Sequence, residues 1–123
     1  MLNSNFSSVI SVLHVDDFAV AAGWYSKWLG RKPDVTPREG IAEWKLAENA
    51  WIQVSVAPDP SIAGKSFAVC GVQDIEKQKA ICQNAGVNTS ETQDLGFIKH
   101  AEVSDPAGNT VVFVQEMLCS RNF

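Results

Sequence analysis

The sequence predicts an α+β protein built from two consecutive copies of one strand–helix–strand–strand–strand unit. Two helix starts and two helix ends recur at nearly constant spacing. Asp17 and Asp74 lie 57 residues apart, and Gly30 and Gly86 lie 56 residues apart. A β-branched apolar run precedes each helix, and further strand-like runs follow it. One copy cannot cover both faces of its sheet, so the two copies must pack on each other or on a second chain.

In the first copy, apolar residues recur at helical spacing over residues 18–29, with Asp16 and Asp17 as capping oxygens and Gly30 as a stop. Strands are expected at 9–15, 33–38 (a short edge), 41–47 and 51–56. In the second copy, Asp74 caps a helix over 75–85 that ends at Gly86. The strands expected there are 66–72, a weak one at 87–92, 96–104 and 110–116.

The last two strands are joined by a turn of residues suited to turns. Asp105 can bond the backbone that follows it, Pro106 fixes φ, and Gly108 and Asn109 tolerate positive φ. The whole chain, 1–123, is expected to form a single domain, with module one at about 8–57 and module two at about 65–117. The Pro-rich stretch 57–61 is the only linker candidate.

Composition argues against several classes of protein. The net charge is −4, and no basic cluster is interleaved with aromatic residues, so nucleic acid is not an expected partner. No Lys or Arg precedes Lys27, and no apolar run could cross a bilayer, so neither a signal peptide nor a membrane association is expected. The widely spaced Cys70, Cys82 and Cys119 are typical of reduced thiols in a cytoplasmic protein.

Several short motifs together resemble the vicinal oxygen chelate superfamily, which includes glyoxalase I, the bleomycin resistance proteins and the extradiol dioxygenases. They are Val12-Leu13-His14-Val15-Asp16-Asp17, Trp24-Tyr25, Leu29-Gly30 and Asp105-Pro106-Ala107-Gly108-Asn109. The resemblance implies two tandem βαβββ modules that form a cup-shaped mixed sheet, with the helices outside and a ligand or metal inside. Many metal-free relatives are homodimers that complete the cup across chains, so a homodimer is the implied assembly.

The resemblance also implies where a metal would bind, because metal-dependent members carry His, Gln or Glu on the first and last strand of each module. The matching positions are Ile10, Gln53, Ser66 (or Phe67, if the register shifts by one) and Val112. Aliphatic side chains cannot ligate a metal, and one amide with one hydroxyl is too weak a donor set for a divalent ion. We therefore expect no bound metal, no other cofactor and no metal-dependent catalysis.

Aromatic residues suggest an organic ligand instead. Trp51 and Gln53 alternate with Ile52 and Val54 along the strand. Because Ile52 and Val54 should pack under the helices, Trp51 and Gln53 should face the cup. Trp44 on the neighbouring strand either joins them or packs in the core. A flat or cationic molecule would gain from stacking on such rings and from cation–π attraction.

Three further residues are candidates for polar contacts in the cup. His14 shares the inward face with Ile10, and His100 shares a face with Glu102. Each histidine is open to three interpretations: a local hydrogen bond, a contact to an organic ligand, or metal ligation. Glu102, with Glu43, would add negative charge.

The sequence thus predicts a metal-free binding protein that sequesters an antibiotic or another aromatic or cationic organic ligand, without catalysis. No nucleophile elbow or phosphate-binding glycine loop is present. The alternative is a glyoxalase-like or dioxygenase-like lyase or oxygenase that uses a metal with non-standard ligands. A third interpretation is a regulatory or structural module with an empty cup.

Overall fold

The structure, a computed structural model, describes residues 4–117 and confirms the α+β class. The first module consists of β1 (Val9–Val15), α1 (Phe18–Leu29), β2 (Val35–Arg38), β3 (Ile41–Ala47) and β4 (Ala50–Val56). A short 3-10 helix, η1 (Pro60–Ile62), lies in the connection. The second module consists of β5 (Phe67–Gly71), α2 (Ile75–Asn84), β6 (Gln93–Asp94), β7 (Ile98–Ser104) and β8 (Thr110–Glu116). Each module forms a four-stranded mixed sheet, in the orders β1-β4-β3-β2 and β5-β8-β7-β6.

Local capping explains why both helices start and end where they do. The Asp17 carboxylate accepts a hydrogen bond from the Val20 amide at 3.2 Å, and Asp74 caps α2 in the same way. Gly30 follows α1 with φ of 74°, a left-handed conformation that favours glycine. These are the positions that the sequence predicted.

One expected strand was wrong. Residues 87–92 do not form a strand, and the edge strand β6 comes after them, at Gln93–Asp94. Val87 gave the apolar signal at this point, and it is only 5% exposed because it packs in the core from a loop. Burial alone therefore explains the pattern, without a hydrogen-bonded ladder.

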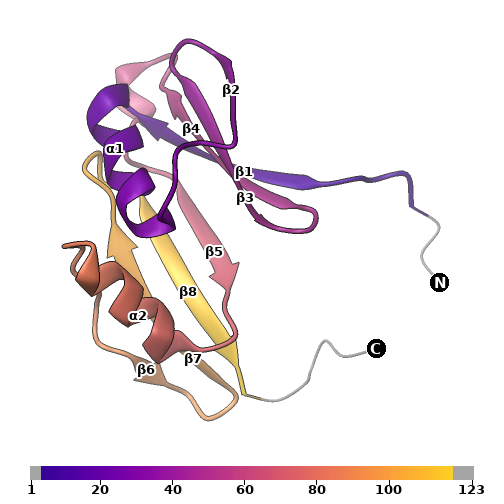
Figure 1. Cartoon of the computed structure of the whole chain (residues 1–123), viewed down its shortest axis with the longest axis vertical. Helices are drawn as coiled ribbons and strands as arrows, with labels where there is room; N and C mark the ends of the chain where they lie inside the picture. Colours follow the sequence, from indigo (N-terminus) through magenta and orange to yellow (C-terminus); the bar gives the residue numbers. More distant parts are fainter. Residues whose placement is uncertain (1–3, 118–123) are drawn as a thin grey trace.

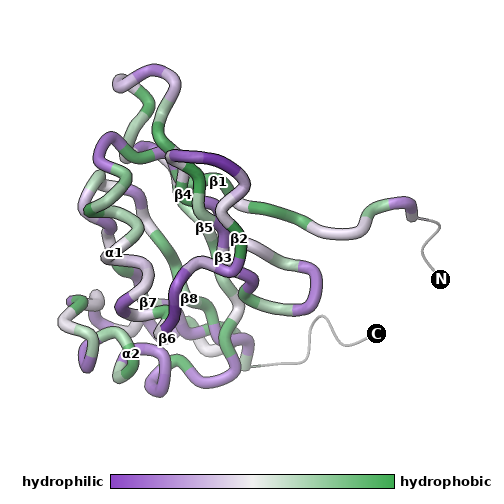
Figure 2. Tube along the Cα trace, turned by 45° about the horizontal axis from the view of Figure 1, so that its top comes forward, coloured by the Kyte–Doolittle hydropathy of each residue, from purple (hydrophilic) through white to green (hydrophobic). Residues whose placement is uncertain are grey.

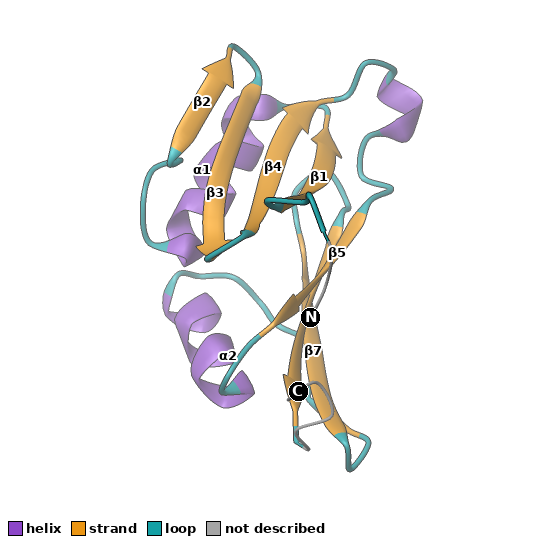
Figure 3. Ribbon diagram, turned by 90° about the vertical axis from the view of Figure 1, so that its right-hand side faces the viewer, coloured by secondary structure: helices purple, strands orange, loops and turns teal. Residues whose placement is uncertain are grey.

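Both helices lie on the same side of the molecule, and each covers one face of its own sheet (Figure 1). The other face of each sheet carries no helix, and we call it the open face. Figure 3 shows the first sheet broadside with α1 behind it, whereas the second sheet is seen nearly edge-on. The two open faces of one chain are therefore turned relative to each other and do not close over one another.

The helix-facing side chains of both modules form one hydrophobic core. Trp28 on α1 packs edge-on against Phe113 on β8, with ring centroids 5.5 Å apart, so a helix of the first module is seated on a strand of the second. On the same helix, Tyr25 is fully buried and packs against Trp44 of β3 at 6.0 Å. The modules thus meet through the Trp28–Phe113 contact, and the Tyr25–Trp44 contact fixes α1 on its own sheet.

A buried polar network also joins the modules, and we call it the junction network: Tyr25, Asp105, Asn109 and the His14 carbonyl. The Tyr25 hydroxyl donates to Asp105 Oδ2 at 2.9 Å, and Asn109 Nδ2 donates to the same atom at 2.9 Å. Asn109 Nδ2 also donates to the His14 carbonyl at 2.8 Å. Burial and the neighbouring Asp105 carboxylate raise the pKa of Tyr25, so its hydroxyl stays protonated and donates.

Asp105 also shapes the turn that brings it to this position. Its Oδ1 accepts hydrogen bonds from the backbone amides of Ala107, Gly108 and Asn109, each at 2.9 Å. The predicted role of Asp105 in the turn is therefore confirmed, and Gly108 has a positive φ of 109°, whereas Asn109 does not adopt a positive φ. Because both carboxylate oxygens are satisfied inside the protein, Asp105 serves the fold and is not available to a ligand.

Candidate functional site

The open face of the first module holds a half-buried polar and aromatic row. In the strand register, Gln53 on β4 lies between Val12 on β1 and Glu43 on β3. Gln53 Nε2 donates to Glu43 Oε2 at 2.7 Å, which fixes the orientation of both side chains. Trp51 lies one row along on the same face and is half-buried. The predicted facing of Trp51 and Gln53 is confirmed.

The open face of the second module is more apolar. Val112 on β8 lies between Val69 on β5 and Glu102 on β7. His100 lies on the same face as Glu102, two residues away, and pairs with Gln93 of β6. Glu102 is exposed and His100 half-buried. The two predicted polar residues therefore share a face, but it is a different sheet from that of Trp51 and Gln53.

Trp44 does not join Trp51 on the open face: of the two positions that the sequence left open, the structure shows the core, and its inclusion among the candidate ligand contacts was wrong. Trp44 is fully buried on the helix side, against Tyr25, and its Nε1 donates to the Arg31 carbonyl at 3.2 Å. Because β3 alternates, the opposite face holds Glu43 and Lys45. A buried indole with a satisfied N–H is a core residue and cannot stack on a ligand in the cup.

His14 lies at the end of β1, next to the junction of the modules. Its side chain is half-buried, and its Nδ1 atom is enclosed with no hydrogen-bond partner among residues 4–117. Its carbonyl accepts from Gly64 N at 3.0 Å and from Asn109 Nδ2. His14 and His100 stand on different sheets, so a ligand would have to span both open faces to contact the two.

Large apolar side chains stand exposed on both open faces. On β1, Ile10 is 43% exposed and Val12 is 39% exposed, and on β5, Phe67 and Val69 are 69% and 60% exposed. Figure 2 shows the hydrophobic colouring along β1. Exposed side chains of this size give each open face an apolar surface of the kind that marks a binding site or an interface.

Comparison with solved protein structures finds several that match nearly the whole chain. A glyoxalase/bleomycin resistance protein from Catenulispora acidiphila matches 88% of this chain and 96% of its own, with 24% identity and a TM-score of 0.80. A bleomycin-binding protein from Streptomyces verticillus, solved with copper(II)-bleomycin, matches 89% and 96%, with 19% identity and a TM-score of 0.74. A lactoylglutathione lyase from Agrobacterium tumefaciens matches 91% and 96%, with 15% identity and a TM-score of 0.72.

The chain has the vicinal oxygen chelate fold. No protein-family model matches the sequence, and no curated protein matches it. The matched structures include both a binding protein and a lyase, so the vicinal oxygen chelate fold leaves the activity to be argued from the side chains of the site.

The side chains at the positions that bind metal in vicinal oxygen chelate enzymes do not fit a divalent ion. Ile10, Gln53 and Val112 lie on the open faces, as their strand positions predicted. At the fourth position, alternation along β5 places Phe67 on the open face with Val69, whereas Ser66 precedes the strand. Three hydrocarbon side chains and one amide, itself bonded to Glu43, offer no ligand set for such an ion.

Other potentially reactive groups do not assemble into a site within the described part of the chain. No group of three or more His, Cys, Asp or Glu side chains there is arranged to hold a metal. Cys70 is half-buried and Cys82 buried, both are free thiols, and burial raises the pKa of each. Cys119 lies outside the described residues.

None of the helices in residues 4–117 is both long and apolar enough to span a membrane.

Sequence reasoning missed two features. It found the Asp105 turn but not the Tyr25 hydroxyl that reaches it from 80 residues away, because no local pattern records such a contact. It also missed a cavity on the helix side of the molecule, between the modules, which is lined by Trp28, Arg31 and Cys70 among others. Helix periodicity predicts that residues of this kind are buried, but not that they leave space between them.

Proposed function

We propose that this protein binds a small organic molecule on its open faces without a metal and holds it without chemical change. The observation that carries the proposal is the side-chain chemistry at Ile10, Gln53, Phe67 and Val112. Where metal-dependent proteins of this fold need electron-pair donors, this chain offers an apolar surface and one amide. Such a surface suits a hydrophobic or aromatic ligand.

The site is completed, in this proposal, by a second copy of the chain. The two open faces of one chain are turned relative to each other, and Ile10, Phe67 and Val69 stand exposed on them. Burying such side chains against a second copy would stabilise a dimer by roughly 25 cal/mol for each Å² of apolar surface removed from water. A ligand between the two copies would then contact Trp51 and Gln53 of one chain and His100 and Glu102 of the other.

The ligand we favour is aromatic or cationic, with an antibiotic as the first candidate. Trp51 offers a ring for stacking, and Glu43 beside Gln53 and Glu102 on the second module supply negative charge. The matched bleomycin-binding protein holds an antibiotic with this fold, which supports the choice of ligand class. The alternative is a lyase or oxygenase with unusual metal ligands, favoured by the fold match to a lactoylglutathione lyase.

Titration of a panel of cationic and aromatic antibiotics, with bleomycin among them, against tryptophan fluorescence tests the proposal. We expect saturable quenching by at least one compound. Trp51→Ala should weaken that compound's binding about tenfold, because ring stacking and cation–π contacts contribute about 1–2 kcal/mol. Trp24→Phe is the matched control, since Trp24 is on α1, on the helix side of the sheet.

Light scattering on the same samples measures the assembly, and the expected mass is twice the 13.4 kDa of one chain. A panel that produces no quenching, or quenching that Trp24→Phe removes and Trp51→Ala leaves intact, would contradict the proposed site. A monomer with full ligand affinity would contradict the role of the second copy.

A further inference from the structure

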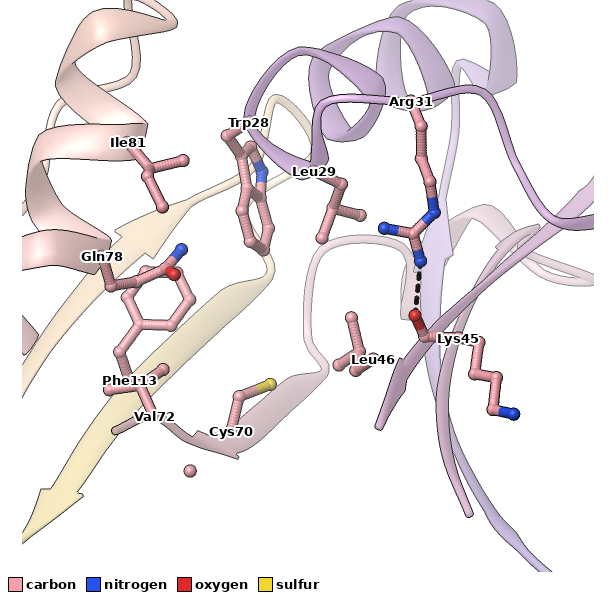
Figure 4. A pocket seen from close by; sticks show the side chains of 11 residues that line it. Trp28, Leu29, Arg31, Lys45, Leu46, Cys70, Val72, Gln78, Ile81 and Phe113 are labelled. Atoms are coloured by element: carbon pink, nitrogen blue, oxygen red, sulfur yellow. Dashed lines mark hydrogen bonds between the residues drawn. The ribbon is translucent and has the colours of Figure 1, made fainter. Parts of the chain in front are cut away.

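The cavity on the helix side lies at the seam between the modules, away from the open faces. It has a volume of about 270 Å³. Trp28 and Leu29 at the end of α1, Leu46 near the end of β3, Ile81 on α2 and Phe113 on β8 provide apolar walls (Figure 4). A second cavity of about 230 Å³ adjoins the first at Leu46 and the end of β5, and it is lined by Trp51 and Val69 of the open faces.

Hydrogen-bond donors without partners border the apolar walls. Trp28 is only 5% exposed, and its Nε1 has no hydrogen-bond partner in the described part of the chain. Arg31 uses Nε and Nη2 for the Asp34 carboxylate and the Lys45 carbonyl, and its Nη1 makes no hydrogen bond within residues 4–117. The Arg31 side chain is 45% exposed, so its Nη1 is open to solvent, whereas a buried N–H without a partner, such as that of Trp28, is uncommon in native proteins and calls for an explanation.

The Trp28 indole N–H and the Arg31 guanidinium lie on either side of Leu29, a residue of the cavity wall. Figure 4 shows the indole nitrogen on the edge of the Trp28 ring that faces Leu29, and a guanidinium nitrogen of Arg31 pointing toward the same side chain from the other side. A ligand beside Leu29 would therefore meet two donors and apolar or aromatic walls. Such a ligand needs an acceptor atom and an apolar ring.

The charge of the site decides between a neutral and an anionic ligand. Arg31 already forms an ion pair with Asp34, with Nη2 and Oδ2 3.0 Å apart. The hydrogen bond from Arg31 also holds the pKa of Asp34 below its usual value, so that carboxylate is ionised at neutral pH. Asp34 thus already neutralises the Arg31 guanidinium, and the ammonium of Lys45, the other basic residue that lines the cavity, lies on the side away from Leu29 (Figure 4). A neutral acceptor can take the remaining Arg31 donor without the cost of desolvating a second anion.

We propose that this seam is a second binding site, for a small neutral aromatic molecule that carries a carbonyl or a similar acceptor. The cavity volume lies just below the usual range for drug-sized ligands, about 300–1,000 Å³, so one or two fused rings are the size it suits. The site is on the opposite side of the sheets from the open faces and does not depend on the function proposed for them.

Three probes of nearly equal size and different polarity test the assignment: naphthyl methyl ketone, naphthoate and ethylnaphthalene. Binding is followed by the backbone amide NMR signals of Leu29, Cys70 and Ile81. The ketone should bind roughly tenfold more tightly than ethylnaphthalene, because only the ketone can accept a hydrogen bond from the charged Arg31 donor. Naphthoate should bind no more tightly than the ketone.

Two variants and one control locate the binding. Arg31→Leu should remove the preference for the ketone over ethylnaphthalene, and Ile81→Trp, at a position 40% exposed on the cavity wall, should abolish binding of all three probes. Phe67→Ala, on the open face of the second module and outside both cavities, should leave the ketone affinity unchanged. Thermal unfolding of each variant shows whether it remains folded.

Three results would overturn the proposal. The first is the absence of saturable shifts at these three residues with the wild-type chain. The second is ketone binding that Phe67→Ala removes and a folded Ile81→Trp leaves intact. The third is tighter binding of naphthoate than of the ketone, which would reverse the charge argument.

Discussion

Replacing Gly64 with alanine should lower the free energy of unfolding by about 3 kcal/mol, one of the two largest effects that we expect from any single substitution. Gly64 has φ of +76°, where an L-residue is strained, and an added Cβ would overlap the Ala107 carbonyl oxygen. That carbonyl cannot move away easily, because Asp105 Oδ1 holds the amides of Ala107, Gly108 and Asn109. Urea-induced unfolding measures the loss.

Gly23→Ala is the matched control. Gly23 is an exposed residue within α1, and nothing lies within 4 Å of an added Cβ. Alanine there should stabilise the protein by about 0.5–1 kcal/mol, because it loses less backbone entropy than glycine on folding. A Gly64→Ala variant as stable as the wild type would contradict the close approach of Gly64 to the turn between β7 and β8.

Removing the Asn109 side chain should cost about 3 kcal/mol of stability and loosen the two modules from each other. Asn109 is fully buried, and it bonds three groups: Ser66 N at 2.9 Å, Asp105 Oδ2 and the His14 carbonyl. In Asn109→Ala, the Ser66 amide loses its partner, and the other two groups each lose one donor. Thermal or urea-induced unfolding measures the change in stability.

A near-isosteric variant separates hydrogen bonding from volume. Asn109→Asp keeps the size of the side chain but lacks the two Nδ2 donors, and it places a second carboxylate beside Asp105. It should therefore be at least as unstable as Asn109→Ala at neutral pH. Asn88→Ala, at an exposed loop position, should change stability by less than about 0.5 kcal/mol. A stable Asn109→Asp would refute the donor role of Asn109.

The sequence predicted the fold well where the signals are local. The bounds of β1, α1, β3 and β8 match the expected ranges, because β-branched runs, an Asp cap and a glycine stop each act over a few residues. The resemblance added the arrangement of the two modules, which periodicity alone leaves open. The strand expected at 87–92 failed because Val87 is buried without being in a sheet.

The candidate site was harder to predict because it depends on strand register and on contacts far apart in the chain. Trp51 and Gln53 were placed correctly, since their neighbours Ile52 and Val54 are plainly core residues. The side of Trp44 was left open, although the charged Glu43 and Lys45 that alternate with it were an available signal for the core. For β5, a register shift of one residue separates Ser66 from Phe67, and the sequence left the two alternatives open.

The central claim, that the open faces bind an organic molecule and no metal, is tested most directly by metal content. The purified chain is incubated with Ni²⁺, Zn²⁺, Fe²⁺ or Mn²⁺, dialysed and subjected to elemental analysis. Because hydrocarbon side chains occupy three of the four ligand positions, each ion should remain far below one equivalent per chain. About one equivalent of any of these ions, lost in Gln53→Ala, would contradict the account and favour the metal-dependent enzyme.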